Sequence, residues 1–237
     1  MTAERGRARI GALVPFTNTN LEPDLALLAP PGVSIHIARL GGYDVDAIPD
    51  SDQMAGLGAA DLDEPLRLLS GARPDVILYG CTSATLSHGR EFDRMLVEKV
   101  AALSGAAAVT AAGAVVESLQ ALGVMRIGFG SPYVADLNDR AVAFLSECGF
   151  QTVSRADHPV ALGNYGQGEL TPDAVFEIGL RADSPEAEAV VLSCTDMRSV
   201  ETLDRLEAEL GKPVISSNQA LMRGAVRRLG LDGRPPE

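Results

Sequence analysis

The sequence predicts an α/β protein with two lobes related by a pseudo-twofold axis, each a mostly parallel four-stranded sheet flanked by helices. Short apolar runs alternate with segments of helical spacing along the 237 residues, a pattern typical of a parallel sheet covered by helices. Several of the runs are continuously apolar, as in strands buried on both faces. The second half of the chain also repeats the pattern of the first, which indicates two similar lobes.

Eight runs have the length and composition of buried strands. In the first half they are Ala8–Val14, Val33–Leu40, Asp75–Gly80 and Ala106–Ala112. In the second half they are Arg126–Ser131, Gln151–Ala156, Ala189–Ser193 and Pro213–Ser217. Segments such as EFDRMLVEKVAALSG and SVETLDRLEAELGK lie between the runs and are predicted to be helices.

The internal repeat sets the predicted lobe boundaries. RARIGALVPFTN matches VMRIGFGSPYVADLN, RPDVILYGCTSAT matches EAEAVVLSCTDMR, and AAVTAAGAVVESLQALG matches KPVISSNQALMRGAVRRLG. The order is kept, and the step from Cys81 to Cys194 is 113 residues. We therefore expect a first lobe at residues 1–113 and a second at 114–218. A C-terminal helix in residues 219–237 is expected to pack back on the first lobe.

Composition and charge exclude several classes of protein. The net charge of −12 argues against nucleic acid as a partner, because phosphate binding needs a basic face, and against binding to a membrane surface. The N-terminus lacks the features of a signal peptide. No apolar run is long enough to cross a membrane. We expect a cytoplasmic protein whose three cysteines stay reduced.

Two of the three cysteines stand at matching points of the repeat. YGCTSAT places Cys81 at the end of one predicted strand, and LSCTDM places Cys194 at the end of its counterpart. Ligands of open parallel sheets bind at the carboxyl ends of the strands, so we expect both sulfurs to face one gap the size of a small diacid. A helix N-terminus lowers the pKa of a thiol beside it, and the same N–H groups bind carboxylates.

The residues around the two cysteines complete the expected site. The hydroxyls of Thr82, Ser83 and Thr195, with nearby backbone donors, are expected to bind an anionic substrate. The alternative is that both cysteines are inert core residues, since cysteine is among the most buried residue types. Cys148 lies in FLSECGF at a predicted helix end and is interpreted as structural.

Other motifs carry little chemistry. The histidines His36, His88 and His158 are scattered, and their spacing does not predict a metal site. GFGSPY lacks the third glycine of a dinucleotide-binding fingerprint. GNYGQGE, residues Gly163–Glu169, is predicted to be a flexible loop.

The quoted segments resemble the aspartate/glutamate racemase superfamily, and within it most closely the maleate cis–trans isomerases, with arylmalonate decarboxylases as relatives. LVPFTNTNLEPD, YGCTSAT and LSCTDMRSVETLDRLEAELGKPVISSNQA are the most specific parts. The resemblance implies a nucleophilic cysteine at Cys81 and a second catalytic cysteine at Cys194. It also implies substrate-binding residues at Asn18, where Asn20 is a near competitor, and at Tyr133 and Asn164.

The resemblance implies conversion of maleate to fumarate through a covalent Cys81 adduct, with Cys194 as acid/base and no cofactor. A racemase or epimerase of the aspartate, glutamate or hydantoin type is one alternative, although PFTNTN stands where racemases carry an Asp-Ser pair. Malonate decarboxylase-like chemistry is another, although those enzymes lack the first cysteine. A two-lobed binding module is the third. TSAT is also more polar than the stretch that follows the first cysteine in maleate isomerases. We expect a small dicarboxylate or amino-acid substrate and a homo-oligomer, either dimer or tetramer.

Overall fold

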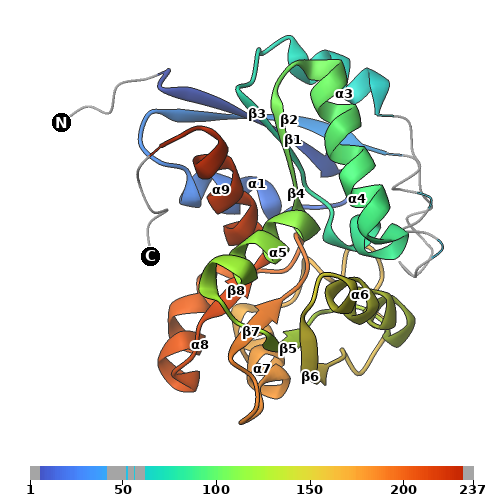
Figure 1. Ribbon diagram of the computed structural model, residues 1–237, viewed down its shortest axis with the longest axis vertical. Helices are drawn as coiled ribbons and strands as arrows, with labels where there is room; N and C mark the ends of the chain where they lie inside the picture. The colour runs from blue at the N-terminus through green and yellow to red at the C-terminus, as the bar shows by residue number, and fades with distance from the viewer. Residues whose placement is uncertain (1–5, 42–51, 53–55, 57–61, 232–237) are drawn as a thin grey trace.

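The computed structural model describes residues 6–41, 52, 56 and 62–231. These residues form two four-stranded parallel sheets, one above the other in Figure 1, with helices on their faces. The strand orders are β2-β1-β3-β4 in the first sheet and β6-β5-β7-β8 in the second. The orders are equivalent, so the two-lobed α/β fold predicted from the repeat is confirmed.

The first sheet comes from the first half of the chain. Its strands are β1 (Ala8–Pro15), β2 (Val33–Leu40), β3 (Val76–Tyr79) and β4 (Ala107–Thr110). Its helices are α1 (Leu21–Leu28), α3 (Asp63–Ser70) and α4 (Thr82–Ser104). Side chains alternate along β1, so that Leu13 packs in the cluster that includes α3 and α4 while Ile10 and Val14 pack with α1. β1 is therefore apolar on both faces, as its continuous run predicted, whereas the edge strand β2 is mostly half-buried.

The second sheet repeats this plan with different helices. Its strands are β5 (Arg126–Gly130), β6 (Gln151–Ala156), β7 (Ala189–Leu192) and β8 (Val214–Ser216). Around it lie α6 (Ala135–Glu147), α7 (Pro172–Ala182), the 3₁₀ turn η1 (Val200–Thr202) and α8 (Leu203–Leu210). All eight predicted strands are present, and their ends differ from the prediction by no more than two residues.

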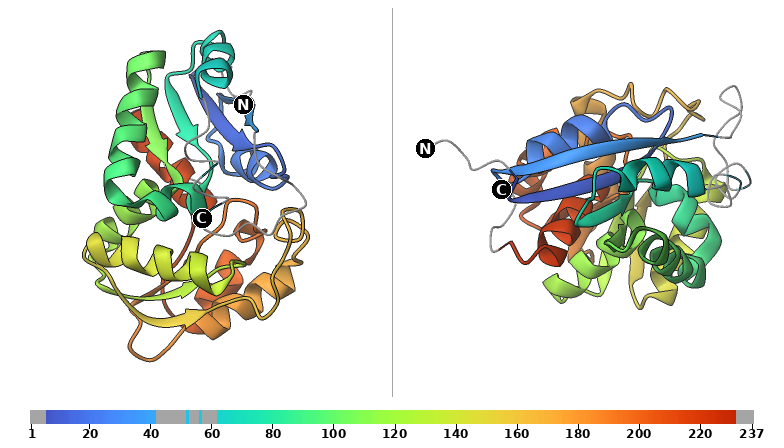
Figure 2. Two further views of the ribbon diagram at one scale, coloured as in Figure 1. Left: turned by 90° about the vertical axis from the view of Figure 1, so that its right-hand side faces the viewer. Right: turned by 90° about the horizontal axis from the view of Figure 1, so that it is seen from above.

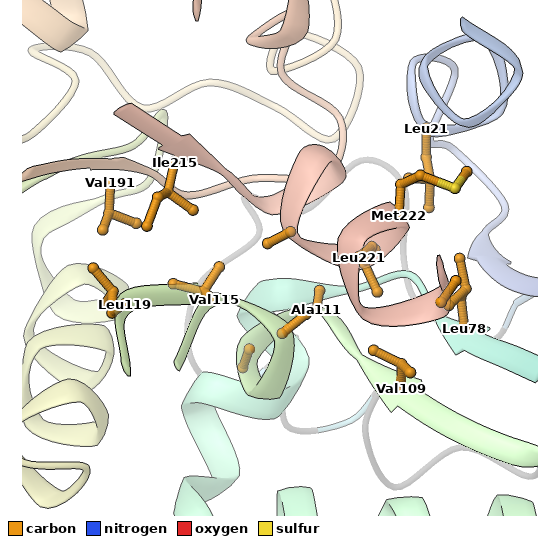
Figure 3. Packing of buried hydrophobic residues seen from close by; sticks show 14 of the residues in the cluster. Leu21, Leu78, Val109, Ala111, Val115, Leu119, Val191, Ile215, Leu221 and Met222 are labelled. Carbon is orange, nitrogen blue, oxygen red and sulfur yellow. The ribbon is translucent and has the colours of Figure 1, made fainter. Parts of the chain in front are cut away.

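Two helices join the sheets. α5 (Ala111–Leu122) and α9 (Ser217–Arg228) follow the fourth strand of each sheet and pack against each other. Figure 3 shows Val115 and Leu119 of α5 beside Val191 and Ile215 of the second sheet. Leu221 and Met222 of α9 lie near Leu78, Val109 and Leu21 of the first lobe.

The lobe boundaries stay predictions. Positions 113 and 218 fall within α5 and α9, and both helices contact elements of both sheets. α9 contacts α1, β3 and β4, while residues 232–237 of the predicted C-terminal helix lie outside the described residues. The left view of Figure 2 shows α9, in red, among the elements of the first lobe.

The carboxyl ends of β1, β3 and β7 meet where the lobes touch. The Thr195 hydroxyl donates to the Gly80 carbonyl across the two lobes at 2.9 Å. A side chain at Gly80 would collide there, because a Cβ atom would lie 2.3 Å from Leu21 Cδ2 and 2.9 Å from the Leu13 carbonyl oxygen. The bond from Thr195 to Gly80 links the two cysteine-containing turns directly. Among the described residues, no helix has the length and apolar character needed to cross a membrane.

Candidate active site

Cys81 stands at the start of a long helix. It is the N-cap of α4, with extended backbone angles (φ −137°, ψ 108°), and is 4% exposed. Its sulfur lies 3.5 Å from the Ser83 hydroxyl, and the backbone N–H groups of Ser83 and Ala84 point their positive ends toward it without forming a side-chain cap hydrogen bond. These donors favour the thiolate and lower the pKa of Cys81, but burial has the larger effect and raises it.

Cys194 stands in a turn that does not continue directly into an α-helix. The chain passes through η1 before α8 begins at Leu203. The Cys194 thiol donates to Gln167 Oε1 at 3.3 Å and accepts from the Asp196 N–H at 3.3 Å. Burial raises the pKa of Cys194 far above its ordinary value, and the nearby negative charge of Asp196 adds to the effect. Cys194 is therefore a neutral thiol at physiological pH.

The prediction that helix N-termini would lower the pKa of both thiols is wrong for this structure. Both values are raised, because both side chains are removed from water and the desolvation of a thiolate outweighs the backbone donors. At Cys194 the helix that was to supply the donors is also missing from the turn. The two thiols nevertheless differ, since Cys81 has three donors and Cys194 has a carboxylate beside it.

Tyr133 lies close enough to both cysteines to interact with them electrostatically. It follows β5, is 2% exposed, and its backbone N–H donates to the Ser131 hydroxyl at 3.1 Å. Its hydroxyl forms a hydrogen bond with the Cys194 sulfur. Burial, followed by the neighbouring thiols, raises the pKa of Tyr133 well above its ordinary value, so the phenol stays protonated and can donate. Both cysteines and Tyr133 belong to one buried cluster.

Asn18 links the first lobe to the Cys194 turn. Its side-chain oxygen accepts from the N–H groups of Asn20 and Leu21 at 3.1 and 2.9 Å, at the start of α1. Its side-chain nitrogen donates to the Thr195 hydroxyl at 3.1 Å. The second hydrogen of that nitrogen is available for a ligand. Asn20, the competing position, donates instead to the Gly168 carbonyl and to Asp196.

The predicted hydroxyl ligands already make bonds within the protein. Thr82 donates to the Ser217 hydroxyl at 3.0 Å, and Thr195 donates to the Gly80 carbonyl. Ser83 contacts the Cys81 sulfur. Asn164 is buried in the loop between β6 and α7. The roles of these residues in substrate binding stay predictions, as does the gap between the sulfurs.

Sequence reasoning missed four residues around Cys194. Gln167 accepts from the thiol, Asp196 adds negative charge, and Asn218 donates to the Thr195 carbonyl at 3.1 Å and to Asp24 at 2.7 Å. Asp196 could have been found, because it lies 113 residues after Ser83, at the equivalent place in the repeat. Gln167 and Asp24 carry no signal, since only the tertiary structure brings their segments to this turn.

The remaining candidates lie elsewhere. Cys148 ends α6, is half-buried and packs against the second buried cluster. His88 stacks on Phe92 with ring centroids 4.1 Å apart, within α4. Among the described residues, no group of three or more His, Cys, Asp or Glu side chains is arranged to hold a metal ion.

The arrangement can perform chemistry with two unequal sulfurs. A thiolate surrounded by donors is a nucleophile. A neutral thiol beside a protonated phenol can exchange a proton with a bound substrate.

Comparisons with known proteins show the family and the fold of the chain. Residues 13–237 match the model of a family described as arylmalonate decarboxylase. A maleate isomerase of Nocardia farcinica is 32% identical over 238 residues, covering 95% of this chain and 92% of that protein.

Two solved structures share the fold across nearly all of their length. A maleate isomerase variant of Pseudomonas putida S16 with maleate has a TM-score of 0.86 at 25% identity, covering 94% of this chain and 92% of that one. A cysteine-to-serine variant of the Nocardia farcinica maleate cis–trans isomerase carries a covalently bound succinylcysteine intermediate. Its TM-score is 0.86 at 29% identity, covering 94% of this chain and 93% of that one.

Proposed function

The chain belongs to the family described as arylmalonate decarboxylase and has maleate isomerases among its relatives, and from this premise we propose that it converts maleate to fumarate. The reaction is cysteine-mediated and needs no cofactor. Its nucleophile is Cys81, and Cys194 exchanges the proton.

The unequal surroundings of the two thiols carry the proposal. The Ser83 side chain and the backbone N–H groups of Ser83 and Ala84 lower the pKa of Cys81, in opposition to burial, and so favour its thiolate. Cys194 has the Asp196 carboxylate beside it, which opposes ionisation. One fold thus supports a nucleophile and an acid within the same buried cluster.

The covalent step starts from the Cys81 thiolate. Its sulfur forms a bond to one alkene carbon of maleate, the π bond breaks, and its electron pair moves to the other carbon and that carbon's carboxylate. Cys194 transfers its proton to this carbon, which gives a succinyl thioether on Cys81. The former double bond is now single and rotates. The Cys194 thiolate then takes a proton back from this carbon and the C–S bond breaks. Fumarate is released, Cys81 is again a thiolate and Cys194 is again a thiol, so the cycle neither gains nor loses protons.

Neutral donors hold the substrate dianion in this proposal. Asn18 has a side-chain N–H available, Tyr133 is a protonated phenol, and Asn164 is buried in the adjacent loop. Hydrogen bonds to a carboxylate grow stronger as charge develops on it during addition, so such donors stabilise the intermediate. Thr82, Ser83 and Thr195 line the cysteine turns and complete the proposed set.

The covalent step can be tested by mass spectrometry of the protein mixed with maleate. We expect an adduct of one maleate on Cys81 and on no other cysteine. Cys81→Ser should lose both the adduct and about 10⁴-fold or more in turnover. Cys148→Ser is the matched control and should keep both. Active turnover with an unmodified Cys81 under rapid quenching would exclude covalent catalysis.

Arylmalonate decarboxylation is the second candidate, because the matching family model carries that description. A panel of maleate, malonates, aspartate, glutamate and hydantoins, followed by NMR in heavy water, separates the candidates. Fumarate formation supports the isomerase. Loss of CO₂ from malonates supports the decarboxylase, and deuterium uptake at an amino-acid α-carbon supports a racemase.

The proposal includes a cytoplasmic enzyme that forms a dimer or tetramer. Sedimentation of the purified protein tests the assembly. Neither part is needed for the chemistry above, which uses side chains of one chain.

A further inference from the structure

We propose that Asp196 is a positioning residue: it holds the 18–20 turn of the first lobe against the Cys194 turn, and it keeps a carboxylate beside the thiol that exchanges the proton. The first part concerns the structure alone. The second rests on the proposed isomerase reaction, in which Cys194 gives and regains a proton.

Asp196 accepts hydrogen bonds from the opposite lobe. Its Oδ1 atom accepts from the Thr19 N–H at 2.8 Å, the Asn20 N–H at 3.1 Å and the Asn20 side-chain nitrogen at 3.1 Å. Its backbone carbonyl accepts from the same side chain at 2.9 Å. The residue is only 6% exposed. Hydrogen bonds to a buried carboxylate are about twice as strong as those between neutral groups, so this contact fixes the turn.

The turn that Asp196 holds contains Asn18. Because Thr19 and Asn20 are bound to the carboxylate, the preceding residue is held where its side-chain nitrogen reaches the Thr195 hydroxyl at 3.1 Å. Loss of the Asp196 contacts would release Asn18 from the Cys194 turn. Its availability to a substrate carboxylate therefore depends on Asp196.

The loop between β6 and α7 packs on the same carboxylate. The Asn20 side chain donates to the Gly168 carbonyl at 3.1 Å. A Cβ atom at Gly168 would lie 2.8 Å from Asp196 Oδ2, so the chain approaches the carboxylate as closely as glycine permits. The neighbouring residue, Gln167, accepts the Cys194 thiol hydrogen. Asp196 thus organises three segments around one sulfur.

The charge of Asp196 acts on the thiol next to it. The carboxylate raises the pKa of Cys194, although the Asp196 N–H donates to the sulfur. The other charged groups that act on Asp196 are Arg39 of β2, which binds the Asn18 carbonyl, and Asp24 of α1. A more basic Cys194 thiolate removes a proton more readily from the carbon of the succinyl intermediate, which is itself a weak acid.

A substrate-free experiment tests the charge directly. In a protein with Cys81→Ser and Cys148→Ser, the rate of alkylation of Cys194 by iodoacetamide is measured against pH. Asp196→Asn keeps an acceptor oxygen and removes the charge, so the pH at half-maximal rate should fall by about one, equivalent to a tenfold change in ionisation. Access to the thiol changes the maximal rate but leaves this midpoint unchanged. Asp93→Asn, a carboxylate in α4 bound to Thr110, is the matched control and should not move it.

Kinetics with maleate test both parts. Asp196→Asn should lower kcat about three- to tenfold with little change in KM, and the succinyl adduct on Cys81 should accumulate because its proton is removed more slowly. The difference from the unmodified protein should shrink as pH falls through about 6, where burial sets the pKa of Asp196. Asp196→Ala should also raise KM, since Asn18 is released.

The outcomes are distinct. An alkylation midpoint that is the same in Asp196→Asn and Asp93→Asn would overturn the electrostatic role. An unchanged KM in Asp196→Ala would overturn the positioning role. If the unmodified protein does not turn over maleate, the proposed function fails, while the alkylation midpoint still decides whether Asp196 controls Cys194. Where Asp196→Ala does not fold, Asn20→Ala removes the side-chain donor to Asp196 and should raise KM in the same way; an unchanged KM there would overturn the positioning role.

Discussion

The turns at Cys81 and Cys194 occupy equivalent places in the two lobes and differ in chemistry. Each follows the third strand of its sheet in sequence, β3 or β7, and each continues with a threonine. After Cys81 the chain enters α4, which is kinked at Gly89 (φ 82°, ψ 178°), and the backbone N–H groups of Ser83 and Ala84 lower the pKa of the sulfur. After Cys194 it makes a turn, and one N–H reaches the sulfur.

The residues two positions after each cysteine have opposite effects on the pKa of the thiol. Ser83 donates to Cys81, whereas Asp196 places negative charge beside Cys194. The turns are also held differently. The Cys81 turn is part of its helix, while the Cys194 turn is held by Asn218 and by the Thr195 bond to Gly80. A duplicated fold can therefore divide a reaction between two like residues by changing only their neighbours.

After the loss of Cys81 itself, the largest expected effect comes from removing the second thiol. Cys194→Ser keeps the shape of the turn and replaces the acid with a hydroxyl that exchanges protons poorly. Turnover of maleate should fall about 10²–10⁴-fold, while Cys81 still forms its adduct, which mass spectrometry should detect. If Cys194→Ser and Cys81→Ser lost adduct formation equally, the division of labour between the turns would be wrong.

A smaller effect is expected at the other turn. Ser83→Ala removes a donor that stabilises the Cys81 thiolate, and such a bond to a charged group contributes about 1.5–3 kcal/mol. We expect kcat/KM at pH 7 to fall about tenfold. Because burial raises the pKa of Cys81, kcat/KM of the unmodified protein should rise with pH above 7, and Ser83→Ala should move this rise to higher pH.

Ser87→Ala is the control for that measurement. Ser87 lies one turn further along α4 and donates to the Ser83 carbonyl at 2.8 Å, not to the sulfur. Its pH profile should match that of the unmodified protein. A Ser83→Ala profile that is lower at every pH by the same factor would indicate a role in binding and not in the ionisation of Cys81.

The smallest effect on activity is expected from Asp24→Asn, beneath the Cys194 turn. This variant should instead change the stability of the protein. Burial raises the pKa of Asp24 from 3.8 to about 6. Between these values the folded protein binds more protons than the unfolded chain, so its stability falls as pH rises through this window, by about 3 kcal/mol for this group. Asp24→Asn keeps an acceptor for Asn218 and removes the buried charge.

We therefore expect Asp24→Asn to be more stable than the unmodified protein at pH 7.5 by about 1–2 kcal/mol. The gain should disappear near pH 4, and kcat should change little. Urea unfolding at both pH values measures this. Glu209→Gln, at an exposed position of α8, should change stability by less than about 0.5 kcal/mol at either pH. A loss of stability at pH 7.5 in Asp24→Asn would mean that the charged carboxylate is needed to hold Asn218.

Local patterns in the chain predicted most of the fold. Continuous apolar runs such as Ala189–Leu192 can only be buried strands, and the repeat of Cys81 at Cys194 indicated two like lobes. Local patterns did not identify Asn18 and Tyr133 as site residues; the resemblance to a known family did. Nothing local distinguishes Gln167 from any other polar residue of a loop.

The sequence by itself determined the order of strands and helices, the duplication, and the presence of a thiol at the end of each third strand, because these depend on neighbours within a few residues. Only the tertiary structure decided the protonation of those thiols. Burial depends on the packing of both lobes, and the groups that act on each sulfur include Gln167 and Tyr133, which approach Cys194 from distant parts of the chain. Desolvation of the thiolates where the two lobes meet outweighs the effect of a helix N-terminus on their pKa values, and no local sequence pattern reveals how strongly a residue will be desolvated.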